Sequence, residues 1–563
     1  MTTIFSSLEI AKRALLAHQL AQQITGHNVS NVNTPGFSRQ RAELTPLSIS
    51  SPPFTLGAGV DVAAVRRIRD RFIDFQLLGE QQALGRNQAQ ETVLKKIEAI
   101  FNEPQGGGSL GTLLDQFFQS LHDLAIHPTE SATRVAVVQQ GTSLALSFRQ
   151  LRGRLDQVKS DLEDEIDVKL RDANSLIDEI ATLNQRIAQV GDQNDPNDLM
   201  DQRDLLVNKL GQLVGVTVLD RTDGTVQVAL AGSGVLLVDG TLATQLTAVT
   251  NLVTDTVDVS AGSVAVTPQS GEVSSLLNAR NSATGPVKQA VTDLDSLARE
   301  IIEEVNRVHA NGAGLTGYSS ATSTNAVSGA LVPLTAAGLP FTPVTGSFDV
   351  IVHDATGAVV STINVPITAG LTTLDDVRLA IDADPNLTAS IAGGLLTVTA
   401  GAGFTFAFAN DSSDTLLAIG LNSFFTGSDA LTIDVNSVVS NDITKVAAAR
   451  ADATGLVHGG DGSNALAMAQ LSTALTMSVG TATFNDFYGT MISDIGAQAR
   501  DASQSMERQQ TVVNLLENLQ QQTSGVSLDE EMTNLIQQQH AYEAAARYVT
   551  VMNQVLDSLL NMI

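Results

Sequence analysis

The carboxyl-terminal segment of this chain carries a strict heptad pattern of apolar, small and amide residues. The positions of the pattern are separated by four and three residues in turn, and the segment contains neither proline nor glycine. Such spacing places these side chains on one face of a continuous α-helix of roughly 54 Å. The predicted seam consists of Leu528, Met532, Leu535, Gln539, Tyr542, Ala546, Val549, Asn553, Leu556, Leu560 and Ile563.

The amino terminus has a matching stripe. Ile4, Leu8, Ala11 and Leu15 recur at helical spacing ahead of Gly26. A lone amphipathic helix is marginal in water, so each apolar face needs a partner. Two interpretations are open. Either the chain polymerises through both termini, or the terminal helices complete a four-helix bundle within one monomer.

Charge and composition exclude several functional classes. The chain has 32 basic and 60 acidic side chains, a net charge of −28, no cysteine and no tryptophan. A protein this acidic is a poor ligand for nucleic-acid phosphates or for an anionic membrane surface. Without cysteine, it has no disulfides, thiolate nucleophiles or zinc–thiolate sites. No run of eighteen apolar residues is present, and the amino terminus lacks the pattern of a cleaved signal peptide.

Changes in composition divide the 563 residues into regions. Residues 216–284 and 316–445 are rich in Thr, Val, Ser and Gly, whereas the regions around them show helical periodicity. Between 308 and 444 the only basic residue is Arg378, against eleven Asp. We therefore predict a multidomain α+β protein with a long-helix coiled-coil terminal and core region and two inserted antiparallel β-rich domains. The second insertion, 316–445, is expected to fold by itself.

Period-2 alternation predicts strands in both insertions. Apolar residues alternate from Val226 to Leu230, from Phe348 to Val352 and from Phe404 to Phe408. Asp354-Ala-Thr-Gly357 predicts a turn after the second of these strands, and Gly401-Ala-Gly403 predicts one before the third. Antiparallel pairing of neighbouring strands is the expected arrangement.

Three further segments predict helices. From Leu155 to Val190 apolar residues recur in steps of three and four, which suits a coiled-coil seam. A second amphipathic pattern runs from Val287 to His309, between the two β-rich blocks. A short helix from Thr373 to Ile381 is predicted because Thr373 and Asp376 form a capping box.

One segment imitates a catalytic motif. Gly107-Gly-Ser-Leu-Gly111 matches G-x-S-x-G, which in hydrolases places a nucleophilic serine between a strand and a helix. The residues before it, 91–101, have a helical pattern that Pro104 ends. We interpret Ser109 or Thr112 as the cap of the next helix, and a serine hydrolase is a remote alternative.

Two charged clusters have structural interpretations. Arg66-Arg67-Ile-Arg69-Asp-Arg71 is interpreted as a helix face that meets acidic residues. The acidic stretch from Asp192 to Asp201 is interpreted as a solvated hairpin between two helices, rather than as a cation site. The histidine spacings do not suit a metal site, and no cofactor is expected.

The most specific pattern is the segment from Gly26 to Gln40, GHNVSNVNTPGFSRQ. Proline disfavours helix at the preceding Thr34, and Pro35-Gly36 predicts a turn, so the chain leaves the terminal helix at a defined angle. This segment, with Asn31 and Phe37, resembles the amino-terminal signature of bacterial flagellar axial proteins, which are rod, hook and hook-associated proteins. Phe37 stands where many members carry Tyr.

Further motifs narrow the resemblance to the hook-associated protein 1 family. They are Leu114–Phe118 with Leu124–Pro128, Asn197–Asp204, Val305–His309 with Gly312, Gly460–Asn464, and the ending Ser524–Glu531 with Tyr542–Arg547; 348–429 resembles the β insertion of such proteins. The resemblance covers nearly the whole chain and is weakest in 216–284 and 316–345. A hook protein shares the Thr-Pro-Gly turn but is not expected to carry the 155–190 coil followed by Asn197–Asp204, and flagellin would lack the turn.

The resemblance implies four regions. They are a terminal coiled-coil domain (1–33 and 528–563), a helical core domain (40–215, 285–315 and 446–527), a first β-rich domain (216–284) and a second, outer β-rich domain (316–445).

It also implies a structural subunit, not an enzyme, that joins the flagellar hook to the filament by polymerising through paired terminal helices. The implied partners are copies of itself, the hook protein, the next hook-associated protein toward the filament, and an export chaperone on the C-terminal helix, with secretion by the flagellar type III route. Another flagellar axial protein is the alternative. The candidate assembly residues are Leu8, Leu15, Asn31, Thr34, Pro35, Gly36, Phe37, Leu535, Gln539, Tyr542, Ala546, Val549, Asn553, Leu556 and Leu560.

Overall fold

The structure is a computed structural model, and it describes residues 2–51, 54–101, 108–190 and 196–560. The chain forms two compact units. The first contains Met1–Leu94, Ser160–Gly285 and Ala499–Ile563, and the second contains Lys95–Lys159 and Pro286–Gln498. Helices α2 (Arg71–Phe101), α4 (Ser131–Val190) and α13 (Phe484–Ser524) contribute to both. The predicted α+β class is confirmed, with long helices and several small antiparallel sheets.

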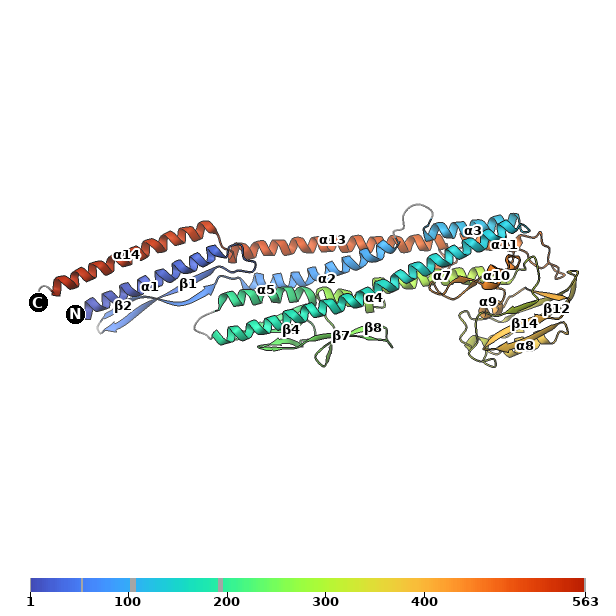
Figure 1. Ribbon diagram of the computed structural model, residues 1–563, viewed down its shortest axis with the longest axis horizontal. Coiled ribbons are helices and arrows are strands. Elements are labelled where there is room, and N and C mark those ends of the chain that lie inside the picture. Colours follow the sequence, from blue (N-terminus) through green and yellow to red (C-terminus); the bar gives the residue numbers. More distant parts are fainter. Residues whose placement is uncertain (1, 52–53, 102–107, 191–195, 561–563) are drawn as a thin grey trace. The chain divides into compact units, whose positions relative to one another are not determined.

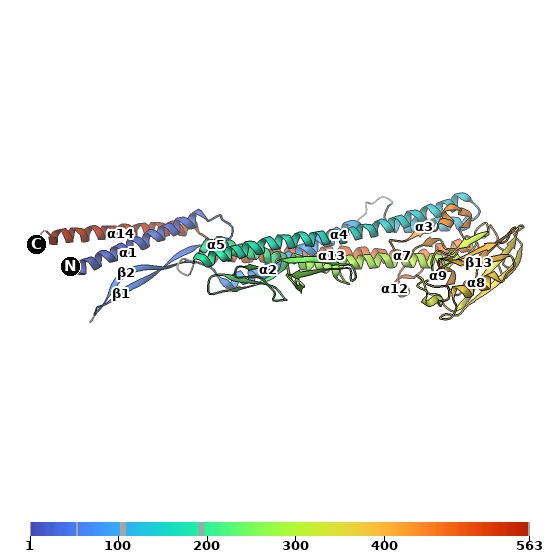
Figure 2. The same ribbon diagram turned by 60° about the horizontal axis from the view of Figure 1, so that its bottom comes forward.

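The first unit holds both chain ends. Its other elements are α1 (Thr2–Ser30), β1 (Gln40–Ser51), β2 (Phe54–Arg67), α5 (Asn197–Val214), β3 (Val216–Asp220), β4 (Val226–Leu230), β5 (Leu236–Asp239), β6 (Leu242–Ala243), β7 (Leu246–Asn251), β8 (Thr256–Ala261), β9 (Val264–Val266), α6 (Gly271–Asn281) and α14 (Leu528–Leu560). Helices α1 and α14 lie side by side, as Figures 1 and 2 both show.

Helix α2 packs between two other helices of this unit. On one side Leu77 contributes to a core with Val513 and Leu516 of α13. On the other side Gly85 lies against Gln212 of α5, where an added Cβ would come within 2.2 Å of the Gln212 carbonyl oxygen. Glycine therefore permits the close approach of α2 and α5.

Two small antiparallel sheets lie against α4. Strands β3 to β6 form one sheet and β7 to β9 form the other. Asn184 of α4 donates to the carbonyl oxygens of Val226 and Gly240 at 2.9 and 2.8 Å, and Asn174 donates to that of Leu246 at 2.8 Å. These amides attach both sheets to the helix, and the alternation predicted for β4 is confirmed.

Residues 40–67 differ from the prediction, which placed them in the helical core. They form an antiparallel β-hairpin of β1 and β2, and Gly59 of β2 lies against Ile10 of α1. The basic cluster predicted on a helix face lies instead at the end of β2 and in the link to α2. The physical reason is local, because the segment contains three prolines that disfavour a continuous helix, and Val60 and Val62 alternate as in a strand.

The second unit combines helices with a β-sandwich. Its other elements are α3 (Leu110–Ile126), α7 (Pro286–Ala310), β10 (Ser320–Thr322), β11 (Gly346–Asp354), β12 (Val359–Ile367), α8 (Leu374–Asp382), β13 (Leu387–Ala392), β14 (Leu395–Ala400), β15 (Phe404–Ala409), α9 (Thr415–Ile419), β16 (Phe425–Thr426), β17 (Asp434–Val435), α10 (Ser437–Asn441), α11 (Ser463–Gln470) and α12 (Met477–Gly480), with short 3-10 turns at Leu334–Ala336, Ile443–Lys445 and Leu471–Thr473. The predicted short helix and its Thr373 capping box are confirmed by α8.

The sandwich consists of two three-stranded sheets, ordered β12-β11-β15 and β10-β14-β13. Their inner faces share one core, to which Phe348, Val398 and Phe406 contribute. Strands β14 and β15 therefore follow each other in the chain but belong to different sheets, in contrast to the expected pairing of neighbours. The predicted turn at 401–403 therefore connects one sheet of the sandwich to the other.

The predicted edge of the outer domain at residue 445 does not coincide with the packing. Phe424 and Phe425 lie inside the predicted insertion but pack on Phe117 of α3, with ring centroids 5.6 and 5.5 Å apart. Asn306 of α7 accepts hydrogen bonds from both of their N–H groups. These rings complete the helical core, and the expectation that 316–445 folds by itself stays a prediction.

The long helix predicted around 155–190 is confirmed within α4. Most apolar members of its predicted seam are buried, among them Leu155, Leu162, Ile166 and Ile187, while Val190 is exposed at the end of the helix. Across the described ranges, the helices lack a stretch both apolar and long enough to cross a bilayer.

Candidate assembly site at the chain ends

The two chain ends contact each other within one chain. Ala11, Ala17 and Ala21 of α1 are buried in the first unit. Between the helices, Nδ1 of His18 lies 2.7 Å from Oε1 of Gln538. Helices α1 and α14 are therefore joined by a polar contact between side chains, and α1 also has small buried residues.

The predicted seam coincides only in part with the covered face of α14. The half-buried members of the candidate set are Leu8, Leu15, Leu535, Ala546, Val549 and Leu556, and the exposed members are Gln539, Tyr542 and Asn553. Gln538, rather than the predicted Gln539, makes the contact with α1. Leu560 ends α14, and its side chain is outside the described residues. Within one chain the two amide side chains of the predicted seam, Gln539 and Asn553, are therefore exposed to solvent.

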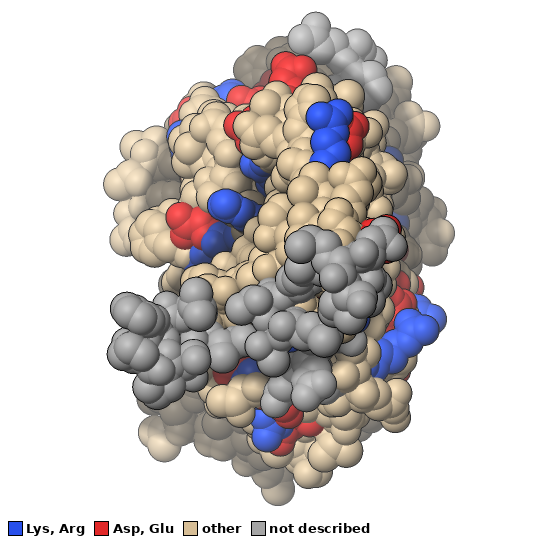
Figure 3. Space-filling model, turned by 90° about the vertical axis from the view of Figure 1, so that its left-hand side faces the viewer, with Lys and Arg blue, Asp and Glu red and all other residues tan. Residues whose placement is uncertain are grey.

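Both terminal helices keep large apolar side chains exposed. They are Phe5, Leu16, Leu528, Met532, Ile536, Tyr548, Val551 and Val555. Met532 and Ile536 are one helical turn apart, as are Val551 and Val555, so each pair forms an apolar ridge. From 532 to 556 the only charged residues are Glu543 and Arg547. Figure 3 views the molecule from the side where both chain ends lie, and uncharged residues occupy most of the described surface in view.

The turn predicted after α1 is formed by local hydrogen bonds. The Thr34 hydroxyl donates to Oδ1 of Asn31 at 3.1 Å, and the N–H of Phe37 donates to the Thr34 carbonyl oxygen at 3.2 Å. The ring of Phe37 packs edge-on against His27, with centroids 5.4 Å apart. Gly36 has φ of +78°, a conformation that favours glycine. Thr34, Pro35 and Gly36 are exposed, and Asn31 and Phe37 are half-buried.

The next three residues, Ser38, Arg39 and Gln40, contact three different helices, and we call them the coupling segment. Ser38 binds α5, because its N–H and hydroxyl donate to the two carboxylate oxygens of Asp201 at 2.7 and 2.8 Å. Gln40 binds α1 through Asn28, whose side chain accepts the Gln40 N–H at 3.0 Å and donates to its carbonyl oxygen at 2.9 Å.

Arg39 points to the start of α14. Its Nε donates to Glu531 and its Nη1 to Glu530, both at 2.7 Å, and its N–H donates to the carbonyl oxygen of Ser524 at 2.8 Å. Glu531 is 2% exposed, and its second oxygen accepts from Nδ2 of Asn28 at 3.0 Å. One buried carboxylate therefore joins α1, the coupling segment and α14.

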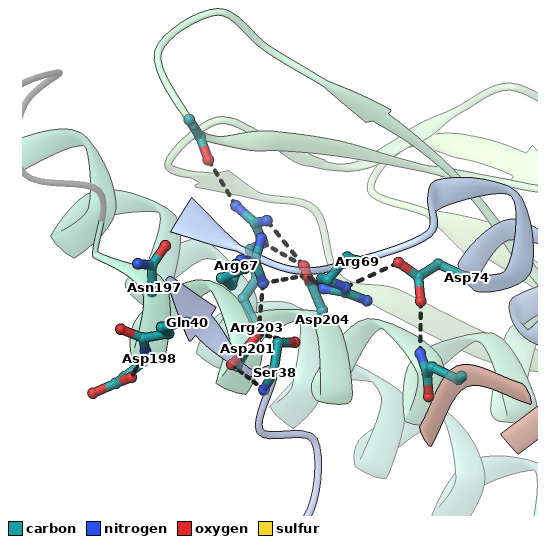
Figure 4. A network of polar contacts seen from close by, with 12 residues as sticks. Ser38, Gln40, Arg67, Arg69, Asp74, Asn197, Asp198, Asp201, Arg203 and Asp204 are labelled. Atoms are coloured by element: carbon teal, nitrogen blue, oxygen red, sulfur yellow. Dashed lines mark hydrogen bonds and ion pairs between the residues drawn. The ribbon is translucent and has the colours of Figure 1, made fainter. Parts of the chain in front are cut away.

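Two arginines, Arg67 and Arg69, hold the base of the hairpin on α5, as Figure 4 shows. Arg67 donates to Asp201 at 2.7 Å and to Asp204 at 2.9 Å, and Arg69 and Arg203 also pair with Asp204. Burial raises the pKa of Asp201, against the effect of Arg67. Burial acts in the same direction on Asp204, but the guanidinium groups of Arg203, Arg69 and Arg67 outweigh it and hold its pKa below the usual value.

This network corrects one interpretation of the sequence and completes another. Asp201 is buried, so the end of the acidic stretch is not a solvated hairpin; residues 192–195 lie outside the described residues. The basic cluster does pair with acidic residues, but its arginines lie at the end of β2 and in the link to α2, not on a helix face. Arg39, Gln40, Asp201 and Glu531 were not among the predicted site residues. The sequence indicates these four residues only weakly. They are charged or polar residues next to recognisable motifs, and the motifs are far apart in the chain.

Ser109 caps a helix, as interpreted from the sequence. Its Oγ accepts the N–H of Thr112 at 3.2 Å at the start of α3, and it contacts the hydroxyl of Thr112 at 2.8 Å. The described element before it is helix α2, which ends at Phe101, and residues 102–107, with Gly107 of the motif, lie outside the described residues. In the described part of the chain, no three His, Asp or Glu side chains are arranged to hold a metal ion.

Three family models match separate parts of the chain. The flagellar hook-associated protein FlgK helical domain matches residues 94–322, the flagella basal body rod protein model matches residues 8–37, and the flagellar basal body rod FlgEFG protein C-terminal model matches residues 520–562. The latter two cover most of α1 with the following turn, and α14.

Curated relatives match over the full length. Flagellar hook-associated protein 1 of Salmonella typhimurium is 30% identical over 99% of both chains. The protein of the same name from Bacillus subtilis is 28% identical over 100% of this chain and 99% of its own. Among solved structures, the flagellar hook junction protein FlgK from Burkholderia pseudomallei shares the fold, with a TM-score of 0.53 and 19% identity over 80% of this chain and 100% of that chain.

Proposed function

The chain belongs to the flagellar hook-associated protein 1 family and is a structural protein of the hook–filament junction, and we propose that it builds this junction by polymerising through the outer faces of α1 and α14. The observation that carries the proposal is the uncovered apolar surface of the terminal helices. Met532 and Ile536 are each 49% exposed within their own chain, and burial against a second copy would remove this apolar surface from water.

Near-neutral charge at the chain ends supports this arrangement. The whole chain carries −28, yet residues 532–556 hold one acidic and one basic side chain. Copies that meet through these helices bring little like charge together, whereas the rest of each subunit repels its neighbours. Association through the chain ends is therefore electrostatically the least costly.

The coupling segment supports a mechanical role. Force applied to α14 reaches α5 through Glu531, Arg39 and the backbone of Ser38, and reaches α1 through Asn28. The contacts are short and mostly buried, so the terminal helices and the core of the first unit move together. A junction between a flexible hook and a stiffer filament requires such a connection. The neighbours in the proposal are the hook protein on one side and the next hook-associated protein on the other.

Export and protection before assembly complete the proposal. The protein is part of the flagellum outside the cell, and we assign it to the flagellar type III export route. The apolar ridges of α14 are an aggregation hazard in the cytoplasm. An export chaperone that covers 528–563 would remove this hazard. The proposal includes no catalysed reaction, in keeping with the capping role of Ser109.

The experiment is a charge placed on one apolar ridge. Ile536→Glu keeps a helix-forming residue but puts a carboxylate where another copy is expected to pack. In cells that carry only this variant, electron microscopy should show bare hooks, with filament protein in the medium, while the purified variant keeps the helix content of the wild type.

The matched control is Gln537→Glu, which adds the same charge at the adjacent, exposed polar position. This variant should form normal junctions. Normal junctions with Ile536→Glu would refute assembly through this face, and failure of both variants would show that charge alone, not the apolar ridge, is limiting.

A further inference from the structure

Strand β12 forms an open edge of the sandwich in the second unit. It is 9 residues long, pairs only with β11, and contains no charged side chain. Free edges are templates for pairing with another chain, and natural proteins usually shield them with charges, bulges or covering loops. An uncharged edge strand is therefore a feature that needs a reason.

The hydrogen-bonding direction along the edge follows from the neighbouring contacts. The N–H of Asp354 points toward the β12 side, because it donates to Ala358 at 3.0 Å, and the carbonyl oxygen of Ser347 points to the other side, because it accepts from Ser412 at 2.9 Å. Backbone groups along β11 alternate in direction, so its β12-facing residues form backbone hydrogen bonds with Ser361, Ile363 and Val365.

The backbone groups of Thr362 and Asn364 consequently point outward. Both residues are exposed, and their N–H and C=O groups have no backbone hydrogen-bond partner among the described residues. Pro366 follows and offers only its carbonyl oxygen, while a bulge precedes Ser361, so the open part of the edge is short and centred on Thr362. It is long enough for an added strand of about five residues.

The two other main edges of the sandwich are closed. On β15, Phe406 exchanges backbone hydrogen bonds with Tyr318 at 2.7 and 2.9 Å. On β13, the N–H of Ala389 donates to the carboxylate of Asp382 at 2.9 Å. Strand β10 is 3 residues long. Among the described residues, β12 has no comparable backbone partner at Thr362 or Asn364.

The segment that contains the open edge is acidic, with eleven Asp and one Arg between 308 and 444, and two of these Asp side chains contact β12. Asp349 on β11 accepts from Asn364 at 2.8 Å, and Asp384 accepts from the Ser361 hydroxyl at 2.6 Å. The single basic residue between 308 and 444, Arg378, is already paired with Asp375. A second copy would bring the same acidic surface, so charge favours a different partner.

We propose that the β12 edge binds an extended segment of another protein, which adds as an antiparallel or parallel strand and carries Lys or Arg on either side of an uncharged core. Main-chain hydrogen bonds to Thr362 and Asn364 provide affinity, and the net negative charge of residues 308–444 favours the basic flanks. This inference does not depend on assembly through the chain ends.

The test uses the full-length protein and a fluorescein-labelled peptide, Lys-Val-Thr-Val-Thr-Val-Lys with blocked ends. Its fluorescence anisotropy should rise saturably with protein concentration. Thr362→Pro removes one outward N–H but no bond to β11, and should weaken binding about tenfold. Thr362→Val keeps the N–H and should bind within about twofold of the wild type.

Peptide variants keep the test independent of folding. On the wild-type protein, a peptide that is N-methylated along one edge and a peptide with Glu in place of Lys should each bind at least about tenfold more weakly. Absent binding, equal binding by a folded Thr362→Pro variant, or equal binding of the Glu peptide would overturn the proposal. Self-association of the wild type that Thr362→Pro abolishes would also overturn it, in favour of a second copy.

Discussion

Arg39 and Glu531 are 492 positions apart in the chain, yet Nε of Arg39 donates to Oε1 of Glu531 over 2.7 Å. The carboxylate is almost completely buried and is shared with Asn28 of α1. This relationship joins the two ends of the protein at the point where both leave the core of the first unit, and it adds an ion pair to the other contacts of the terminal helix pair.

Removal of this ion pair should be costly. Arg39→Ala leaves a buried carboxylate with one amide partner, and we expect a loss of about 3 kcal/mol in the free energy of unfolding of the first unit. Urea denaturation measures this loss. The control is Arg66→Ala, which breaks an exposed pair with Glu43 of similar length, 2.8 Å, and should cost at most about 1 kcal/mol. Equal costs would show that Glu531 is not effectively buried in solution.

Two glycines of one helix should respond to alanine in opposite directions. Gly85→Ala places a Cβ 2.2 Å from the Gln212 carbonyl oxygen and should destabilise the α2–α5 contact by about 3 kcal/mol. Gly79→Ala meets no atom within 4 Å and should stabilise the helix by up to about 1 kcal/mol. Thermal unfolding of the two variants provides the comparison. A neutral Gly85→Ala would contradict the close packing of α2 on α5.

The second unit should lose stability in mild acid because of His309. Burial lowers the pKa of this histidine to about 4, and its neutral ring donates from Nδ1 to Asn422 at 2.7 Å and accepts the N–H of Ala447 at 3.0 Å. The unfolded chain takes up the proton near pH 6.5, so the stabilisation is complete above that value and is lost as the pH falls toward 4.

Hydrogen exchange of α7 measures this effect. The opening free energy of the wild type should fall by about 3 kcal/mol between pH 7 and pH 4. His309→Gln should be less stable at pH 7 but show a clearly smaller dependence on pH. The same slope in both proteins would assign the acid sensitivity to other groups, such as the carboxyl of Asp442, whose pKa the hydrogen bond from the Thr444 side chain lowers.

The exposed amides of the predicted α14 seam should control register in the assembled state. Gln539 and Asn553 are exposed within one chain, so neighbouring copies are the surfaces left to contact them. Buried amides specify helix register at a cost in stability. Replacement of both with Leu should strengthen association but produce misassembled junctions, visible by electron microscopy. Gln537→Leu with Gln554→Leu, at exposed amides off the seam, is the control. Normal motility of the Gln539→Leu/Asn553→Leu variant would reject the idea.

Local signals in the sequence account for much of the fold. Thr373 and Asp376 lie three residues apart, so their capping box was predictable, and so was the apolar seam of α4 between Leu155 and Ile187. The flagellar family could be assigned because the turn motif is short and contiguous. Each of these signals depends on residues within a few turns of one another.

Other features depend on contacts that no local pattern encodes. The burial of Asp201 depends on contacts with Ser38 and Arg67, which are more than 130 positions away in the chain. Its neighbours in the sequence are acidic, and they led to the prediction of a solvent-exposed hairpin. Phe424 and Phe425 have the alternating neighbours of a β-domain but pack on Phe117. Gln538, next to the predicted seam residue Gln539, contacts His18 of α1 within the chain, because a heptad pattern fixes a helix face only to within about one residue.

The most direct test of the account is the accessibility of one side chain before and after assembly. The chain has no cysteine, so Ile536→Cys introduces a single thiol on the apolar ridge of α14. Ile536 is 49% exposed in the single chain, so the thiol should react rapidly with a maleimide in the free subunit and become protected in isolated hook–filament junctions. Leu331→Cys, at a position 76% exposed in the second unit, controls for access of the reagent and should react in both states. Equal labelling of Cys at position 536 in free and assembled protein would contradict assembly through the terminal helices.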